Sequence, residues 1–239
     1  MDEIDLSFDI NLDDFSDIEI ELDDSFDSRY IKPPKTKQVS DRFLKYSNAE
    51  KLANDIDITP NCRYFVIING SFIFGDFMEA LILEKGYKVK KMTISTLSMS
   101  ENNVDSLAGL LADGYISELN LIISDYFFSH ERGNLIPYIY EQLDVDGDRF
   151  QLAVAGTHCK KCLIETECGK KITIHGSANL RSSGNIEQFE IEEGSQMYDF
   201  NNEYQDLIIE KYKTIDKSIR RSKLWNLITK EDGIRKRRI

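Results

Sequence analysis

Four polar side chains in the middle of the chain have the types and spacing needed for chemistry on a phosphate ester. His158 and Lys160 are two residues apart, as are Ser177 and Asn179. On extended backbone, residues two apart point to the same side, so each pair can face one site. A neutral imidazole can attack phosphorus, while the cation, hydroxyl and amide can bind the phosphate oxygens. The pattern indicates attack on a phosphodiester without a metal ion.

Three short blocks in this region resemble the HxKxxxxD, GSxN and NxE signature of the phospholipase D superfamily. They are His158-x-Lys160-x4-Glu165, then Gly176-Ser177-x-Asn179, then Asn185-x-Glu187. The stretch GSANLRSSGNIEQF is similar in particular to phospholipase D-like proteins encoded by phages and prophages. Two features depart from the signature. Glu165 replaces the usual aspartate, although this longer carboxylate would still orient backbone, and a longer segment than usual separates it from the GSxN block.

The resemblance implies a role for each residue of the blocks. His158 would attack phosphorus and form a phosphohistidine, while a second histidine protonates the leaving oxygen and later activates water. Lys160 and Asn179 would neutralise and hydrogen bond the non-bridging oxygens, with Ser177 near the same face. Glu187 would hold an imidazole, of its own subunit or of a partner, in the useful tautomer.

The chain contains a single HxK block. Because the mechanism of the family uses two histidines, the resemblance implies a homodimer in which two copies of the motif meet at a two-fold axis. The implied function is a metal-independent phosphodiesterase, with nucleic acid favoured over lipid as the substrate. The alternative is a nucleic-acid-binding module of the same fold, serving phage DNA handling, in which catalysis is weak or lost. A lipid-directed enzyme is a third hypothesis.

The remaining sequence predicts an α/β fold. The first half predicts alternating elements, with helices at 42–54, 77–84, 104–112 and 135–143 and strands at 63–69, 89–97 and 119–127. This alternation favours right-handed crossovers and a mixed, largely parallel sheet flanked by helices, which is the α/β sandwich that the resemblance implies. The second half predicts a hairpin turn at Gly169 among consecutive strands, followed by a long helix. These strands are expected at 150–155, 157–165, 171–176 and 187–191, and the helix from residue 201.

Charge is distributed unevenly along the chain. The formal charge is −12, but residues 1–27 hold twelve Asp or Glu and no Lys or Arg. The remaining residues hold 30 acidic and 30 basic side chains, so they are neutral overall. Residues 211–239 hold eleven Lys or Arg against three acids, which favours nucleic acid as a partner. We therefore expect an acidic tail and proline linker (1–40), a phospholipase D-like domain (41–210) and a basic C-terminal helix or tail (211–239).

The acidic tail allows two interpretations. Its charge density is typical of a disordered, solvated segment. Its apolar residues, beginning with Ile4, Leu6 and Phe8, nevertheless alternate with polar ones at the period of a strand. The tail could therefore pair with a sheet edge or occupy a basic groove of the same chain, where its carboxylates would imitate phosphates.

The composition indicates a cytoplasmic protein, in a bacterial host cell if the chain is phage-encoded. No apolar run approaches the ~20 residues that span a bilayer, and the acidic N-terminus is unlike a secretory signal.

Cys159, Cys162 and Cys168 with His158 or His175 could be considered as zinc ligands. Their spacing is irregular, however, and a metal on His158 would remove the nucleophile. We expect reduced thiols and neither a metal nor another cofactor.

The other two histidines have weaker links to the site. His175 directly precedes the GSxN block and shares strand parity with Ser177, so it could face the site, although we expect it to be a neighbour only. His130 follows a predicted strand within the polar sequence SHERG. We expect it in a surface loop.

Overall fold

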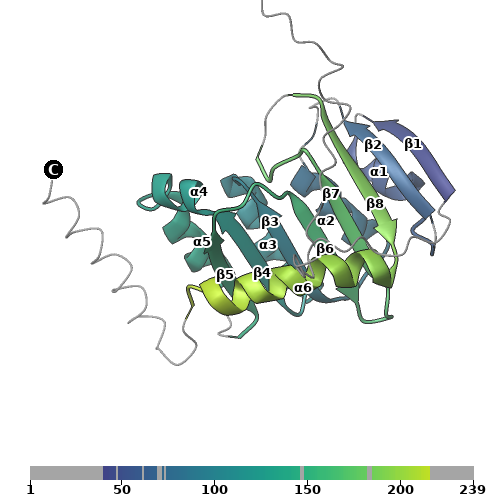
Figure 1. Ribbon diagram of the computed structural model, residues 1–239. Coiled ribbons are helices and arrows are strands. Elements are labelled where there is room, and N and C mark those ends of the chain that lie inside the picture. Colours follow the sequence, from purple (N-terminus) through teal and green to yellow (C-terminus); the bar gives the residue numbers. More distant parts are fainter. Residues whose placement is uncertain are drawn as a thin grey trace, which may run out of the picture. The chain divides into compact units, whose positions relative to one another are not determined.

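The computed structural model describes residues 48–60, 62–68, 72, 74–145, 148–181 and 185–215, together with the backbone of residues 40–46 (Figure 1). The predicted acidic tail with its proline linker, and the basic segment from residue 216 onward, lie outside the described residues. None of the helices in the described part is both long and apolar enough to cross a membrane.

The described strands form one mixed sheet. They are β1 (Ser40–Tyr46), β2 (Cys62–Ile68), β3 (Val89–Thr96), β4 (Leu119–Ser124), β5 (Phe150–Ala155), β6 (Lys161–Thr166), β7 (Lys171–Gly176) and β8 (Glu187–Glu193). Their order in the sheet is β1-β2-β8-β7-β6-β3-β4-β5. The pairs β1–β2, β3–β4 and β4–β5 are parallel, whereas β2–β8, β8–β7, β7–β6 and β6–β3 are antiparallel. Only β6 and β8 therefore oppose the common direction of the described strands, which confirms the predicted mixed sheet, and four of its seven strand pairs are antiparallel.

Helices flank both faces of this sheet. They are α1 (Ala49–Asp55), α2 (Phe74–Glu84), α3 (Glu101–Ala112), α4 (Asp125–His130), α5 (Leu135–Leu143) and α6 (Ser195–Tyr212). In Figure 1, α2, α3 and α5 lie behind the sheet and α6 crosses its front, over the strands from β5 to β7. The arrangement confirms the α/β fold class.

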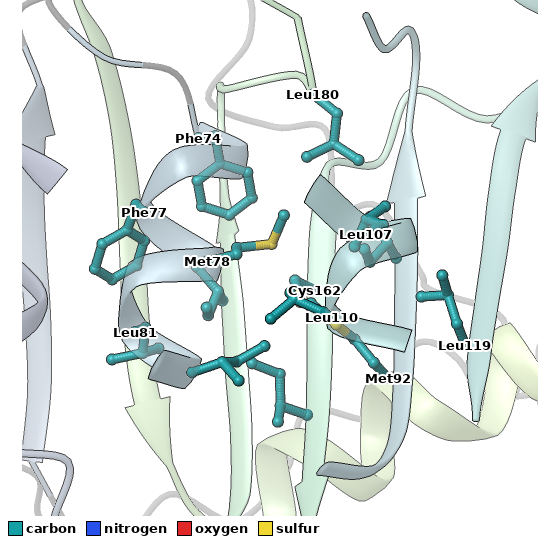
Figure 2. Close-up of a cluster of buried hydrophobic side chains, with 14 of the residues drawn as sticks. Phe74, Phe77, Met78, Leu81, Met92, Leu107, Leu110, Leu119, Cys162 and Leu180 are labelled. Atoms are coloured by element: carbon teal, nitrogen blue, oxygen red, sulfur yellow. The ribbon is translucent and has the colours of Figure 1, made fainter. Parts of the chain in front are cut away.

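The apolar core lies between the sheet and the helices behind it (Figure 2). Apolar residues recur at a spacing of three and four along α2, which gives the helix one face to bury. All six residues of β4 are buried, as expected for a central strand covered on both faces. The core side chains labelled in Figure 2 come from both layers: Phe74, Phe77, Met78, Leu81, Met92, Leu107, Leu110, Leu119, Cys162 and Leu180. This close-packed layer fixes the strands whose ends carry the motif residues.

The front face of the sheet packs against α6 through one aromatic and two amide side chains. Tyr198, Asn201 and Gln205 of α6 are buried. An ion pair also fastens the helix to β3, with Lys91 Nζ 2.6 Å from Asp206 Oδ1. The helix begins at Ser195, six residues before the predicted start at residue 201.

The predicted helix at 42–54 is wrong in its first half. Residues 40–46 form β1, which pairs in parallel with β2 over its whole length. The helix begins only after Asn48, whose side-chain oxygen accepts a hydrogen bond from the Lys51 N–H at 2.8 Å. Asn48 is an N-cap, so the local sequence did contain the signal for a later start.

Two predicted strands have different limits in the structure. The strand expected to reach residue 127 ends at Ser124, because the Ser124 hydroxyl accepts the Phe127 N–H at 3.0 Å and caps α4. The strand expected from residue 157 begins only at Lys161. The predicted hairpin between β6 and β7 is confirmed, and Gly169 has the positive φ of 86° expected in its turn.

Candidate active site

The three motif blocks meet at one edge of the sheet, where β6 begins, β7 ends and β8 begins. Lys161 pairs with His175 across β6 and β7, and Gly176 pairs with Phe189 across β7 and β8. The Gly176 N–H also donates to the Lys160 carbonyl at 3.2 Å, which extends the first ladder into the HxK block. The strand pairing therefore places the HxK, GSxN and NxE blocks side by side.

His158 and Lys160 lie in the loop that joins β5 to β6. His158 is exposed, and among the described residues its imidazole has no hydrogen-bond or ion-pair partner. Lys160 is half-buried, and its ammonium donates to the carbonyl of His158 at 3.1 Å. The nucleophile predicted from sequence is thus open to a substrate, and a fixed cation lies beside its backbone.

The GSxN and NxE blocks are joined by a network around Ser177. The Ser177 hydroxyl donates a hydrogen bond to the Glu187 carboxylate. It also accepts the Gln188 N–H at 3.1 Å, and the Ser177 N–H donates to the Gln188 carbonyl at 2.9 Å. Ser177 and Glu187 are therefore held as one unit at the start of β8.

Gly176 is required for this close approach of β7 to β8. A Cβ at this position would lie 2.2 Å from the Gln188 carbonyl oxygen and 2.6 Å from the Phe189 Cα. Phe189 is itself fixed in the core, with its ring centroid 5.3 Å from that of Phe74 and 4.9 Å from that of Phe77. Because Phe189 cannot move away, the position admits only glycine.

Asn179 is held by the segment that follows β3. Its side-chain oxygen accepts the Leu97 N–H at 3.2 Å. The next residue is fixed as well, because the Leu180 N–H donates to Thr96 Oγ1 at 3.3 Å and the Ser100 N–H donates to the Leu180 carbonyl at 2.8 Å. Since the amide oxygen is used by the protein, the two N–H donors of Asn179 remain for a ligand oxygen; they have no partner in the described part of the chain.

Glu165 is not brought to this edge. It lies four residues into β6, roughly 13 Å along the strand from Lys161 at the rise of an extended chain. Its carboxylate forms an ion pair with Lys90, at 2.8 Å. The structure therefore gives Glu165 a place at the opposite edge of the sheet, away from His158.

Glu187 and His158 are not paired within the described chain. Glu187 accepts from Ser177, and no carboxylate of a described residue bonds to the His158 imidazole. Glu187 therefore does not orient the histidine of its own subunit. That it orients the imidazole of a partner subunit stays a prediction.

The other two histidines lie outside the three motif blocks. His175 is on the α6 face of β7, since its neighbour Ile174 is in the core on the opposite face. Its Nε2 is 3.6 Å from Glu190 Oε2, and burial lowers its pKa. His130 is exposed as expected, but it ends α4 rather than lying in a loop, and its ring contacts that of Tyr126. Helix α4 was not predicted, because the apolar residues of DYFFSH continue the pattern of β4.

The cysteines do not gather around a metal. Cys162 is fully buried within β6, and burial raises the pKa of its thiol. Cys159 and Cys168 are exposed, one before β6 and the other after it. Within the described residues, no three His, Cys, Asp or Glu side chains are placed to share a metal ion.

Comparison with known proteins gives partial structural likenesses. No family model matches the sequence, and neither does any curated protein. Solved structures that are similar in part include the following three. Polyphosphate kinase from Porphyromonas gingivalis has 14% identity and a TM-score of 0.47, over 63% of this chain and 26% of that one. Phosphatidylserine synthase from Haemophilus influenzae Rd KW20 has 15% identity and a TM-score of 0.46, over 74% of this chain and 47% of that one.

The third similar structure is the phospholipase D family member Nuc from Salmonella typhimurium. It has 12% identity and a TM-score of 0.41, over 54% of this chain and 84% of that one. This chain therefore spans about a quarter of the length of the polyphosphate kinase and about half of that of the phosphatidylserine synthase.

Proposed function

We propose that this chain is a metal-independent phosphodiesterase of the phospholipase D-like class, which cleaves nucleic acid as a homodimer through a phosphohistidine. One observation carries the proposal: the pairing of β6, β7 and β8 brings the HxK, GSxN and NxE blocks to a single edge of the sheet. An accessible imidazole, a cation and amide donors on that edge are the groups needed to displace an alkoxide from phosphorus.

In the first step, a neutral nitrogen of His158 attacks phosphorus. The P–N bond forms as the P–O bond to the leaving group breaks, and the leaving oxygen takes a proton from a second, protonated imidazole. Lys160 and the Asn179 N–H donors stabilise the charge on the non-bridging oxygens. The accessible imidazole of His158 and the fixed amide of Asn179 support this assignment.

In the second step, water attacks phosphorus and the P–N bond breaks. The second imidazole, now neutral, takes the proton of the water and returns to its starting state. The HxK block occurs once in the chain, so we assign this imidazole to His158 of a second copy across a two-fold axis. In that arrangement Glu187 would orient the imidazole of the partner subunit.

Two features of the sequence favour nucleic acid over lipid. Residues 211–239 hold eleven Lys or Arg against three acids, a surplus that suits a phosphate backbone. The GSxN region also resembles phage-encoded proteins, which we take as support for DNA.

The proposal is tested by incubating the purified full chain with single- and double-stranded DNA in EDTA. We expect cleavage by the wild type, none by His158→Ala, and cleavage close to the wild-type rate by His175→Gln, the matched change in a histidine beside the site. Absence of cleavage by the wild type, or equal cleavage by the wild type and His158→Ala, contradicts the proposal.

The alternative function is a nucleic-acid-binding module without turnover. It is favoured by the lack of a described carboxylate partner for His158, because an unoriented imidazole is a weaker catalyst. DNA binding by the wild type without cleavage, strengthened by deletion of residues 1–30, would support this alternative.

A further inference from the structure

Helix α4 lies at the same edge of the sheet as the candidate active site. It follows β4 directly, and in Figure 1 it lies at the end of the sheet from which the β5–β6 and β7–β8 connections leave. Ser124 pairs with Ala155 at the ends of β4 and β5. One carboxylate oxygen of Asp125 is 4.0 Å from where a Cβ of Gly156 would be. Gly156 is two residues from His158, so their Cα atoms are at most about 7 Å apart. The start of α4 is therefore a neighbour of the nucleophile.

Hydrogen bonds connect α4 to Asn179. The Ser124 hydroxyl accepts the Phe127 N–H at 3.0 Å and donates to the Leu97 carbonyl at 2.9 Å. The N–H of the same Leu97 donates to Asn179 Oδ1 at 3.2 Å. Phe127 anchors the helix further, because its side chain is only 5% exposed. The helix is thus fixed relative to a residue that we assign to the phosphate.

Two aromatic rings are presented to solvent on this helix. Tyr126 is 64% exposed, and its ring centroid is 3.9 Å from that of His130, with 34° between the ring planes. The Tyr126 carbonyl accepts a hydrogen bond from His130 Nδ1 at 2.9 Å, which fixes the imidazole against the phenol ring. The Tyr126 N–H donates to Asp125 Oδ1 at 2.8 Å. The pair is held in place although no apolar contact buries it.

The chemistry of this pair fits a base better than a phosphate or an acyl chain. The face of an aromatic ring stacks on any nucleobase, so this contact does not depend on the sequence of the nucleic acid. Neither a phosphate nor an acyl chain has an aromatic ring that could stack on this face.

We infer that Tyr126, supported by His130, forms a stacking platform for a base next to the phosphodiester that is cleaved at His158. The inference rests on the proposed function, because it specifies the substrate of the same site as a nucleic acid strand with unpaired bases. A base in a duplex is already stacked on both sides, so single-stranded substrate should be preferred.

The experiment measures binding in full-length His158→Ala protein, so that the substrate is not consumed. A fluorescently labelled single-stranded oligonucleotide is compared by anisotropy with an abasic chain of the same length. Adding Tyr126→Ala should weaken binding of the oligonucleotide about 5- to 100-fold and change binding of the abasic chain less than about 2-fold. Tyr126→Phe should bind both chains as the parent does. Leu83→Ala, which removes an exposed apolar side chain from α2, should also leave both unchanged.

Equal weakening for both chains, no weakening for either, or no binding of the oligonucleotide by the parent protein would overturn the platform. The DNA cleavage assay of the wild type separates this result from the proposed function. Selective weakening by Tyr126→Ala without any cleavage would contradict the phosphodiesterase but support the platform. Cleavage without a selective Tyr126 effect would contradict the platform alone.

Discussion

At the residue scale, the amide of Asn179 has one side bound by the protein and the other available to the substrate. The oxygen accepts the Leu97 N–H, which leaves the N–H donors for phosphate. Asn179→Asp keeps an acceptor for Leu97 but replaces the donors with a negative charge. We therefore expect an unchanged fold with a loss of about 10²–10³-fold in the rate of cleavage, the usual effect of removing one transition-state donor.

Circular dichroism and DNA cleavage rates measure these two effects separately. The matched control is Asn134→Asp, at an exposed asparagine in the turn before α5, which should cleave at the wild-type rate. If Asn179→Asp cleaved as fast as the wild type, Asn179 would have no role at the phosphate.

His175 makes a pH-dependent contribution to stability. Burial lowers its pKa in the folded state, opposed by the Glu190 carboxylate and assisted by Lys161. The unfolded side chain titrates near its ordinary value of about 6.5, so below that pH the unfolded chain binds more protons than the folded one. The free energy of unfolding should therefore fall as the pH drops below about 6.5.

Urea denaturation between pH 5 and pH 8 measures this dependence, and His175→Gln should flatten the part of the curve below about pH 6.5. The other charged groups that act on the imidazole, Arg63 and Glu192, remain in the variant. The same slope in both proteins would show that other groups cause the dependence.

At the scale of elements, the contact between β7 and β8 depends on Gly176. Gly176→Ala must separate the strands, because the new Cβ would lie 2.2 Å from the Gln188 carbonyl oxygen and Phe189 behind it is locked in the core. We expect a loss of about 1–3 kcal/mol in the free energy of unfolding. Cleavage should fall as well, because the Ser177–Glu187 bond is strained by the same shift.

Gly109→Ala is the matched control. Gly109 lies within α3 and its Cβ would meet nothing within 4 Å, so the change should stabilise the protein by about 0.5–1 kcal/mol. Denaturation curves of the two variants should therefore shift in opposite directions. A Gly176→Ala protein as stable and active as the wild type would mean that this approach of the strands is not needed.

The order of the elements was largely predictable, whereas several of their ends were not. The alternating and consecutive strands were predicted because apolar runs and turn residues are local signals. The strand β1 was not, because an edge strand gains its stability from pairing with β2, which no local pattern shows. Helix α4 was not predicted because its N-cap, Ser124, is also the last residue of a fully buried strand. The apolar pattern of that strand continues into the helix.

The site was predictable as a set of residue types but not as a set of contacts. The order of the blocks indicated His158, Lys160 and Asn179, and the structure brings their segments together. Glu165 belongs to the same sequence block, yet an extended strand carries it to the opposite edge, where it pairs with Lys90. The Leu97 contact of Asn179 spans 82 residues, so only the fold reveals it.

At the scale of the whole molecule, the proposal requires two copies of His158 in each active site. Equal amounts of wild-type and His158→Ala protein, mixed and allowed to exchange subunits, should form dimers of which about a quarter contain both histidines. Activity should therefore fall to about a quarter of that of the same total amount of wild type. A value of about half would indicate subunits that work independently, and so contradict a shared site.

Trapping the covalent intermediate on His158 tests the phosphohistidine mechanism directly. The protein is mixed in EDTA with an excess of bis(p-nitrophenyl) phosphate, quenched in alkali and digested for mass spectrometry. We predict an initial burst of nitrophenolate and a p-nitrophenyl phosphoryl group on the peptide that contains His158, both lost in His158→Ala. Turnover with no adduct on His158, or with an adduct on another residue, would contradict a phosphohistidine mechanism at His158.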